Sequence, residues 1–217
     1  MESKWRGARA LPELIPVFPL ARVILLPHGQ LPLNVFEPRY LAMIDDAFKA
    51  QRLIGIVQPT IEEAAKPDLY KIGGIGRITS FVEVENRYHI TLTGISRFEI
   101  LSELPVTTPY RQVQVSYDRF VSDRSFEDHE GSIDRPALLS ALRRYFSVNK
   151  IDSDWESIER APGEALVNSL SMIAPVEPAE KQALLEAPTV GERARILIAL
   201  IELSLADAAP SSNHKLN

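Results

Sequence analysis

The spacing of apolar and polar positions divides the chain into two halves of different character. Up to about residue 120, apolar residues come in short runs that prolines, glycines and polar turns separate. Five prolines fall between residues 15 and 40, and almost no charge appears there before Glu37. Because proline cannot donate to a sheet and pushes the preceding residue toward extended conformations, this segment predicts short, bent, buried strands.

The rest of the first half also predicts strands, with one helix among them. Val113 and Val115 alternate with polar residues, which is typical of a strand with one buried and one solvated face. A turn around Asn86 predicts a hairpin, because asparagine tolerates positive φ. Residues 37–50 have apolar positions at helical spacing and Pro38 in the first turn, so a helix is expected there. The strands are expected at residues 15–20, 22–26, 30–36, 53–58, 78–85, 88–93, 98–104 and 110–120.

The second half predicts a bundle of about four helices. Residues 121–134 are acidic and poor in aliphatic side chains, so they are interpreted as a linker or surface loop. Beyond them, apolar residues recur at helical spacing, and Pro136, Pro162 and Pro178 each stand where a helix can begin. Two pairs have the three-residue spacing of a capping box: Ser153 with Glu156, and Thr189 with Glu192.

These elements predict an α+β fold. Seven or eight short strands favour a closed or semi-closed β-barrel, because closure leaves no exposed sheet edge. We expect a flexible N-terminus at residues 1–13, a β-barrel subdomain with one early helix at 14–124, a helical subdomain at 125–207 and a flexible tail at 208–217.

Composition and charge narrow the classes of function. The chain has 217 residues, 45% of them hydrophobic and none of them cysteine, so disulfides and cysteine-ligated zinc are excluded. Residues 1–120 carry 14 basic and 13 acidic side chains, without the basic excess that favours nucleic-acid binding. The N-terminal residues lack the apolar stretch of a signal peptide, and no uncharged apolar run approaches the roughly 20 residues that cross a bilayer. A cytoplasmic protein without membrane contact is expected.

Sequence motifs predict no cofactor and no metal ion. Gly73, Gly74 and Gly76 are clustered, but no lysine follows at Walker A spacing, so a flexible strand entry or a bulge is the expected role. Acidic residues at 123–134 lack the spacing of a calcium loop, and solvated surface charge is expected there. The four histidines are isolated from one another: His28, His89, His129 and His214.

The most distinctive polar and aromatic group is FEPRY at residues 36–40. The carboxylate of Glu37 can cap the helix that Pro38 begins, since free N–H groups and the favourable dipole end meet there. Arg39 can tie this helix to a neighbouring strand through backbone carbonyls. Direct contact with a ligand is the alternative, and on that reading the candidate binding residues are Phe36, Glu37, Arg39 and Tyr40.

Leucines of the first strands leave a related question open. A peptide-binding groove would leave them uncovered, whereas a barrel core would bury them, and burial is the expected outcome. The residues concerned are Leu25, Leu26, Leu31 and Leu33.

Several motifs, taken in order, resemble the Lon protease N-terminal (substrate-binding) domain family. The resemblance extends over about residues 14–205, and Gly76 stands where the family usually has alanine. The motifs are FPL with a proline-punctuated strand and FEPRY at residues 18–40, DLYKIGGIGRI at 68–78, TGISRF at 93–98, PAEKQALL at 178–185 and TVGER at 189–193.

This resemblance implies a PUA-like β-barrel followed by a C-terminal helical bundle. The Ser–Lys pair of Lon proteases lies in a separate domain whose motif is missing here, so the chain resembles the stand-alone bacterial form without ATPase and protease domains. We expect a non-enzymatic module that binds protein or unfolded peptide segments, as an adaptor in proteolysis or quality control. RNA binding and an enzyme with an unrecognised small-molecule pocket are the alternatives. The sequence predicts no oligomeric state.

Overall fold

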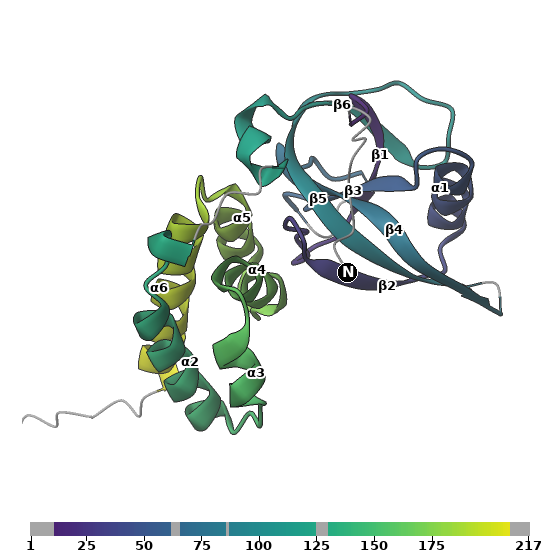
Figure 1. Ribbon diagram of the computed structural model, residues 1–217. Helices are drawn as coiled ribbons and strands as arrows, with labels where there is room; N and C mark the ends of the chain where they lie inside the picture. The colour runs from purple at the N-terminus through teal and green to yellow at the C-terminus, as the bar shows by residue number, and fades with distance from the viewer. Residues whose placement is uncertain (1–10, 62–65, 86, 125–129, 209–217) are drawn as a thin grey trace, which may run out of the picture.

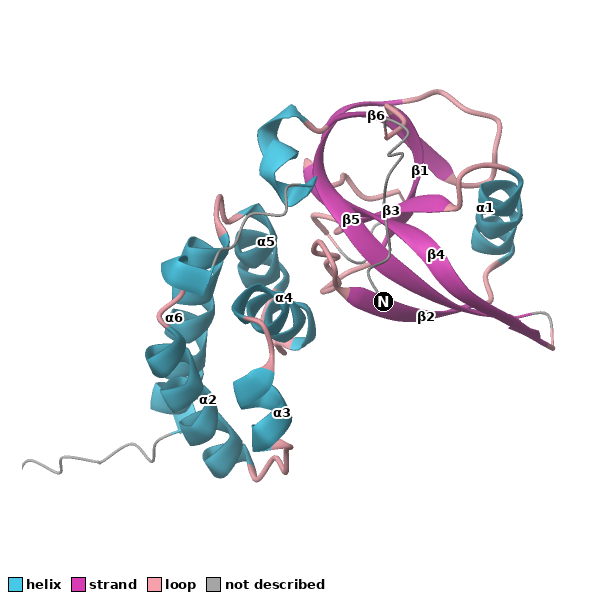
Figure 2. Ribbon diagram, in the orientation of Figure 1, coloured by secondary structure: helices cyan, strands magenta, loops and turns pink. Residues whose placement is uncertain are grey.

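The computed structural model describes residues 11–61, 66–85, 87–124 and 130–208, and it has two parts (Figure 1). Strands and one helix form the first part, and helices form the second (Figure 2). Most of the two termini expected to be flexible, and the middle of the expected linker, lie outside the described residues. The predicted α+β class is confirmed.

The described strands form one mixed sheet in the order β2-β5-β4-β3-β1-β6. β5 and β6 also pair with each other, so the pairings of β5, β4, β3, β1 and β6 form a ring. β2 pairs with β5 and lies outside this ring. β1 and β3 run parallel, and every other pair is antiparallel. The strands are β1 (Leu14–Pro19), β2 (Gln30–Val35), β3 (Leu53–Val57), β4 (Ile72–Val84), β5 (Arg87–Glu103) and β6 (Arg111–Ser116).

Helices lie beside the sheet and after it. Asp134 caps α2 by accepting a hydrogen bond from the Ala137 N–H, and the hydroxyl of Thr189 accepts from the Glu192 N–H as predicted. The predicted Ser153 cap is wrong by one residue, because the Asp154 carboxylate accepts the Ser157 N–H. The helices are α1 (Pro38–Lys49), α2 (Arg135–Asn149), α3 (Trp155–Arg160), α4 (Gly163–Ile173), α5 (Pro178–Glu186) and α6 (Val190–Ala208), with 3₁₀ turns η1 (Asp118–Arg124) and η2 (Glu130–Ser132).

The strand predicted at residues 22–26 is wrong, and two sheet glycines show why. This segment crosses over the face of β4 and β5 instead of pairing along an edge. A Cβ atom on Gly74 would lie 1.9 Å from the Leu25 carbonyl oxygen, and one on Gly94 would lie 2.0 Å from that of Leu26. The glycine cluster therefore admits another backbone at close range. The predicted bulge is confirmed by a register shift between Ile75 and Gly76.

Four other strand predictions need adjustment. The strand predicted at 78–85 begins six residues earlier, at Ile72, as β4. The predicted hairpin is present between β4 and β5, with Glu85 at φ 49°, while Asn86 lies outside the described residues. The strands predicted at 88–93 and 98–104 are one continuous strand, β5, because the residues between them keep pairing with β4. β6 ends at Ser116, four residues before the predicted end, since η1 follows.

The two parts share one hydrophobic core. Ile24, Leu26 and Ile72 from the strand-rich part are buried in the same cluster as the apolar faces of α2, α4, α5 and α6. Separate clusters fill the space between the sheet and α1 and the space inside the ring of pairings. The helical part is therefore packed against the sheet by apolar contact, not merely tethered to it.

Candidate functional site

The far ends of β4 and β5 form a ribbon with β2 that runs out past α1 (Figure 1). His89 of β5 lies between Val82 of β4 and Asn34 of β2, and pairs with both. Val84 of β4 pairs with Arg87 of β5. Since alternate residues of a strand share a face, one set of side chains points away from the core. We name this surface the outer ribbon face; it comprises Pro32, Asn34, Phe36, Ser80, Val82, Val84, Arg87, His89 and Thr91.

The outer ribbon face exposes several apolar side chains together. Phe36 is 59% exposed, Val82 54% and Val84 46%. A hollow of about 320 Å³ lies on this surface, lined by residues from all three strands, among them Pro32, Val82 and His89. Of the three exposed residues, Val82 lines the hollow. Apolar side chains that are exposed together are typical of an interaction site.

The opposite face of the ribbon is partly covered by α1. The Phe81 ring lies edge-on to the Phe48 ring of α1 at 4.7 Å and to the Tyr88 ring at 5.0 Å. The Tyr88 hydroxyl donates a hydrogen bond to the Asp45 carboxylate of α1, at 2.9 Å. α1 thus occupies part of the inner face, where Phe81 stays 39% exposed.

Arg87 gives the outer ribbon face a positive charge. Its guanidinium carbon lies 5.6 Å from the centre of the Phe36 ring, a cation–π contact. Within the part of the chain that the structure describes, Arg87 forms no ion pair with a carboxylate. The cation is therefore available to an acidic group on a partner.

The structure places the four candidate binding residues of FEPRY in different surroundings. Phe36 lies on the outer ribbon face, whereas Glu37 occupies the N-cap position of α1 without a side-chain capping bond, against the prediction. Its carboxylate instead pairs with Arg39, at 2.7 Å, so the predicted tie from Arg39 to a strand is also absent from the described contacts. Arg39 also lies 4.5 Å from the centre of the Tyr40 ring.

Tyr40 serves the core. Its ring is buried and stacks on Phe18 with the ring centres 4.0 Å apart. Burial raises the pKa of its hydroxyl, and the nearby Arg39 guanidinium only partly opposes this rise. Phe36 therefore lies on the outer ribbon face and Tyr40 in the core, while the side chains of Arg39 and Glu37 are 50% and 44% exposed.

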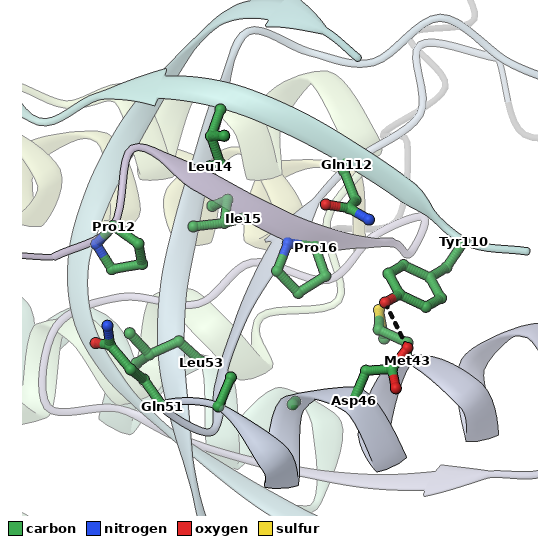
Figure 3. A pocket seen from close by; sticks show the side chains of 12 residues that line it. Pro12, Leu14, Ile15, Pro16, Met43, Asp46, Gln51, Leu53, Tyr110 and Gln112 are labelled. Carbon is green, nitrogen blue, oxygen red and sulfur yellow. Dashed lines mark hydrogen bonds between the residues drawn. The ribbon is translucent and has the colours of Figure 1, made fainter. Parts of the chain in front are cut away.

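A second hollow, of about 270 Å³, lies between α1, β1 and the start of β6 (Figure 3). Its wall is mainly apolar, with Pro16, Met43 and Leu53 among its residues. Its polar side is closed by the Tyr110 hydroxyl, which donates to the Asp46 carboxylate at 2.9 Å. This volume suits one or two apolar side chains better than a cofactor.

The Tyr110–Asp46 pair is not arranged for proton transfer near neutral pH. Burial, followed by the hydrogen bond to Asp46, raises the pKa of Tyr110 to about 12. The hydrogen bond from Lys49 lowers the pKa of Asp46. The phenol therefore keeps its proton and the carboxylate stays ionised, so the pair orients α1 against the sheet.

Sequence reasoning missed a buried polar junction between the two parts. Arg97 of β5 is bound by Asp123 at 2.7 Å, and the two side chains are only 3% and 6% exposed. The same guanidinium donates to the carbonyls of Leu185 and Ala187 at the end of α5, at 3.0 and 2.6 Å. The prediction of solvated charge for residues 123–134 is therefore wrong at Asp123.

Other buried polar side chains reinforce this junction. Gln58 donates to the Gln182 side chain at 3.0 Å, and Asn168 donates to the Pro27 carbonyl at 3.1 Å. Within the helical part, Lys181 of α5 donates to the carbonyls that end α4, those of Ser171, Met172 and Ala174. The "R" of TGISRF and the "K" and "Q" of PAEKQALL were thus visible as polar residues within apolar patterns, but their partners were not.

The remaining candidate residues form no chemical site. Among the described residues no group of histidine and carboxylate side chains is placed to hold a metal ion. His28 lies in an exposed turn and His89 on the outer ribbon face, while His129 and His214 lie outside the described residues. Leu25 and Leu26 are buried as expected, and Leu31 and Leu33 are half-buried against the core. No described helix has the length and apolar character needed to cross a membrane.

Comparison with known proteins identifies the family. Residues 14–202 match the family described as the ATP-dependent protease La (LON) substrate-binding domain. This chain belongs to the LON substrate-binding domain family. The match begins at the first strand and ends within α6, so it includes both parts of the fold.

Curated relatives are Lon proteases, and the chain spans about a quarter of their length. It is 28% identical over 204 residues to the Lon protease of Anaeromyxobacter dehalogenans, covering 88% of this chain and 23% of that protein. It is 27% identical over 198 residues to Lon protease 2 of Myxococcus xanthus, covering 88% and 24%.

Solved structures show the same fold. The N-terminal domain of a Mycobacterium avium complex Lon protease has a TM-score of 0.63 and 19% identity, over 87% of this chain and 98% of that one. A Lon N-terminal domain protein from Xanthomonas campestris has a TM-score of 0.59 and 20% identity, over 86% and 97%. The resemblance to a Lon N-terminal domain is confirmed.

Proposed function

We propose that this chain binds unfolded protein segments without cleaving them and acts as an adaptor in proteolysis or protein quality control. Membership of the LON substrate-binding domain family over residues 14–202 is the observation that carries the proposal. The exposed apolar outer ribbon face supports it, because such a surface suits a partner whose own apolar side chains are uncovered.

The polar groups of the described residues favour binding over catalysis. Arg97 and Asp123 bind each other at the junction between the parts, and Lys181 is committed to carbonyls within the helical part. Tyr110 and Asp46 satisfy each other beside the second hollow. Candidate catalytic groups need a reactive partner within hydrogen-bond reach and an open position for substrate, and these groups serve packing instead.

Two probes of one protein test the proposal. Fluorescein-labelled α-lactalbumin stays unfolded when its disulfides are reduced and carboxymethylated. The native form, with its disulfides intact, is folded. Fluorescence anisotropy is expected to show saturable binding of the unfolded form and none of the native form. Equal binding of both forms, or of neither, would contradict the proposal.

A cleavage assay tests the other half of the statement. Labelled casein incubated with the purified chain, with and without ATP, is expected to remain intact over hours. Reproducible cleavage that purifies with the chain would show that it is an enzyme.

A further inference from the structure

We infer that the outer ribbon face is the docking surface, and that its preferred occupant is an extended, unfolded segment with apolar side chains and a carboxylate on one side. This inference rests on the proposed function and adds the location of the site and the chemistry of its partner. Phe36, Val82, Val84 and Arg87 are the residues that carry it.

The geometry of the face favours an extended partner. Val82 and Val84 are two residues apart on β4, and Asn34 of β2 is two residues from Phe36, which directly follows that strand. Such positions recur about every 6.5–7 Å along a strand, which is also the spacing of alternate side chains in an extended peptide. A segment lying along the ribbon can therefore place every second side chain against Val82, Val84 and the hollow.

Side-chain contact is favoured over strand addition at β2. β2 pairs only with β5 among the described strands, so its other edge is open. Pro32 stands in the middle of this strand and has no N–H to offer an added strand. The recognisable features of the surface are thus its side chains, not a continuous row of backbone donors.

Charge complementarity selects the acidic group of the partner. The Arg87 guanidinium lies over the Phe36 ring, beside the apolar valines, and has no carboxylate partner among the described residues. Ring contact holds the guanidinium plane in place and leaves N–H donors for bidentate binding of a carboxylate. A lysine at the same position of the partner would meet a like charge.

The test uses a pair of peptides that differ in one charge. Each fluorescein-labelled decapeptide has Val and Phe at alternate positions, Ser or Thr between them, and either Asp or Lys on the apolar side. Fluorescence anisotropy is expected to give at least tenfold tighter binding of the Asp peptide. Arg87→Glu is expected to reverse this preference, and Val82→Glu to weaken binding of both peptides at least tenfold.

Val148→Glu is the matched control, because Val148 of α2 is 54% exposed, as is Val82. This variant is expected to bind both peptides as the wild type does. Circular dichroism and urea denaturation of all three variants verify that each is folded. If Val82→Glu does not fold, Arg87→Glu still tests the inference: a reversed preference between the Asp and Lys peptides supports it, and an unchanged preference overturns it.

The outcomes separate this inference from the proposed function. If the wild type binds unfolded α-lactalbumin and both ribbon variants bind it equally well, the docking surface lies elsewhere and only this inference fails. If the wild type binds no unfolded probe, the proposed function fails first. If sedimentation shows a wild-type dimer that Val82→Glu dissociates, the face belongs to a second copy of the chain and the inference is overturned.

Discussion

Replacing Arg97 with leucine is expected to destabilise the protein more than any exposed charge substitution. Leucine preserves part of the packing but leaves the Asp123 carboxylate, only 6% exposed, without its cation. Four side-chain hydrogen bonds disappear: two to Asp123 and one each to the carbonyls of Leu185 and Ala187. The junction between β5, η1 and α5 therefore loses its central donor.

The expected loss follows from the cost of a buried charge without its partner. Removing one member of a buried ion pair typically costs about 3–5 kcal/mol. A domain of ordinary stability has an unfolding free energy of about 5–15 kcal/mol, so much of it is lost. Arg97→Leu/Asp123→Leu removes both charges of the pair, so neither is left buried without the other, and we expect this double variant to be more stable than Arg97→Leu by about 1 kcal/mol or more.

Urea denaturation followed by circular dichroism measures these differences. At an m-value of about 1–3 kcal/mol per molar urea, the Arg97→Leu midpoint is expected to fall by about 1 M or more. Arg144→Leu is the matched control, since Arg144 pairs with Glu202 at 2.8 Å while both side chains remain exposed, and such pairs contribute about 1 kcal/mol or less. The reasoning is refuted if Arg97→Leu costs no more than Arg144→Leu, or if the losses of the two junction substitutions simply add.

Two further predictions concern the sheet and the contact between α4 and α5. Gly74→Ala is expected to lower the unfolding free energy by about 1–3 kcal/mol, because the new Cβ would collide with the Leu25 carbonyl. Gly131→Ala is the control, since no atom lies within 4 Å of its Cβ position. Equal urea midpoints of the two variants would disprove the close approach at Gly74. Burial lowers the pKa of Lys181 to about 8, below the pKa of the same lysine in the unfolded chain. Between these two values the unfolded state binds more protons than the folded state, so the unfolding free energy is expected to rise between about pH 7.5 and 9.5. Lys181→Met removes this group, and a rise of the same size in that variant would assign the effect to other residues.

Local sequence predicted elements wherever local chemistry decides them. Prolines marked the short strands and the starts of α1, α2 and α5, and Thr189 marked the start of α6, because these residues act on backbone groups within one turn. The segment at 22–26 was misread because its apolar residues suit a strand equally well. Whether such a segment joins an edge or crosses a face depends on the glycines of β4 and β5.

In the candidate site, too, the sequence indicated a motif but not its long-range contacts. FEPRY was visible as a motif, yet α1 turns Tyr40 into the core and leaves Phe36 at the end of β2, beside Arg87 of a strand about fifty residues away. No pattern along the chain marks Val82 and Val84 as partners of Phe36. Only the pairing of β2 and β4 on either side of β5 brings them to one face.

By itself, the sequence determined the α+β class, the family resemblance, and the start of most helices. Tertiary structure alone decided that the two parts share a core, that Arg97 and Asp123 are buried together, and that the outer ribbon face is exposed. The physical reason is range: the Arg97 contacts join residues 26, 88 and 90 positions apart, and burial of a charge depends on such partners, not on neighbours along the chain.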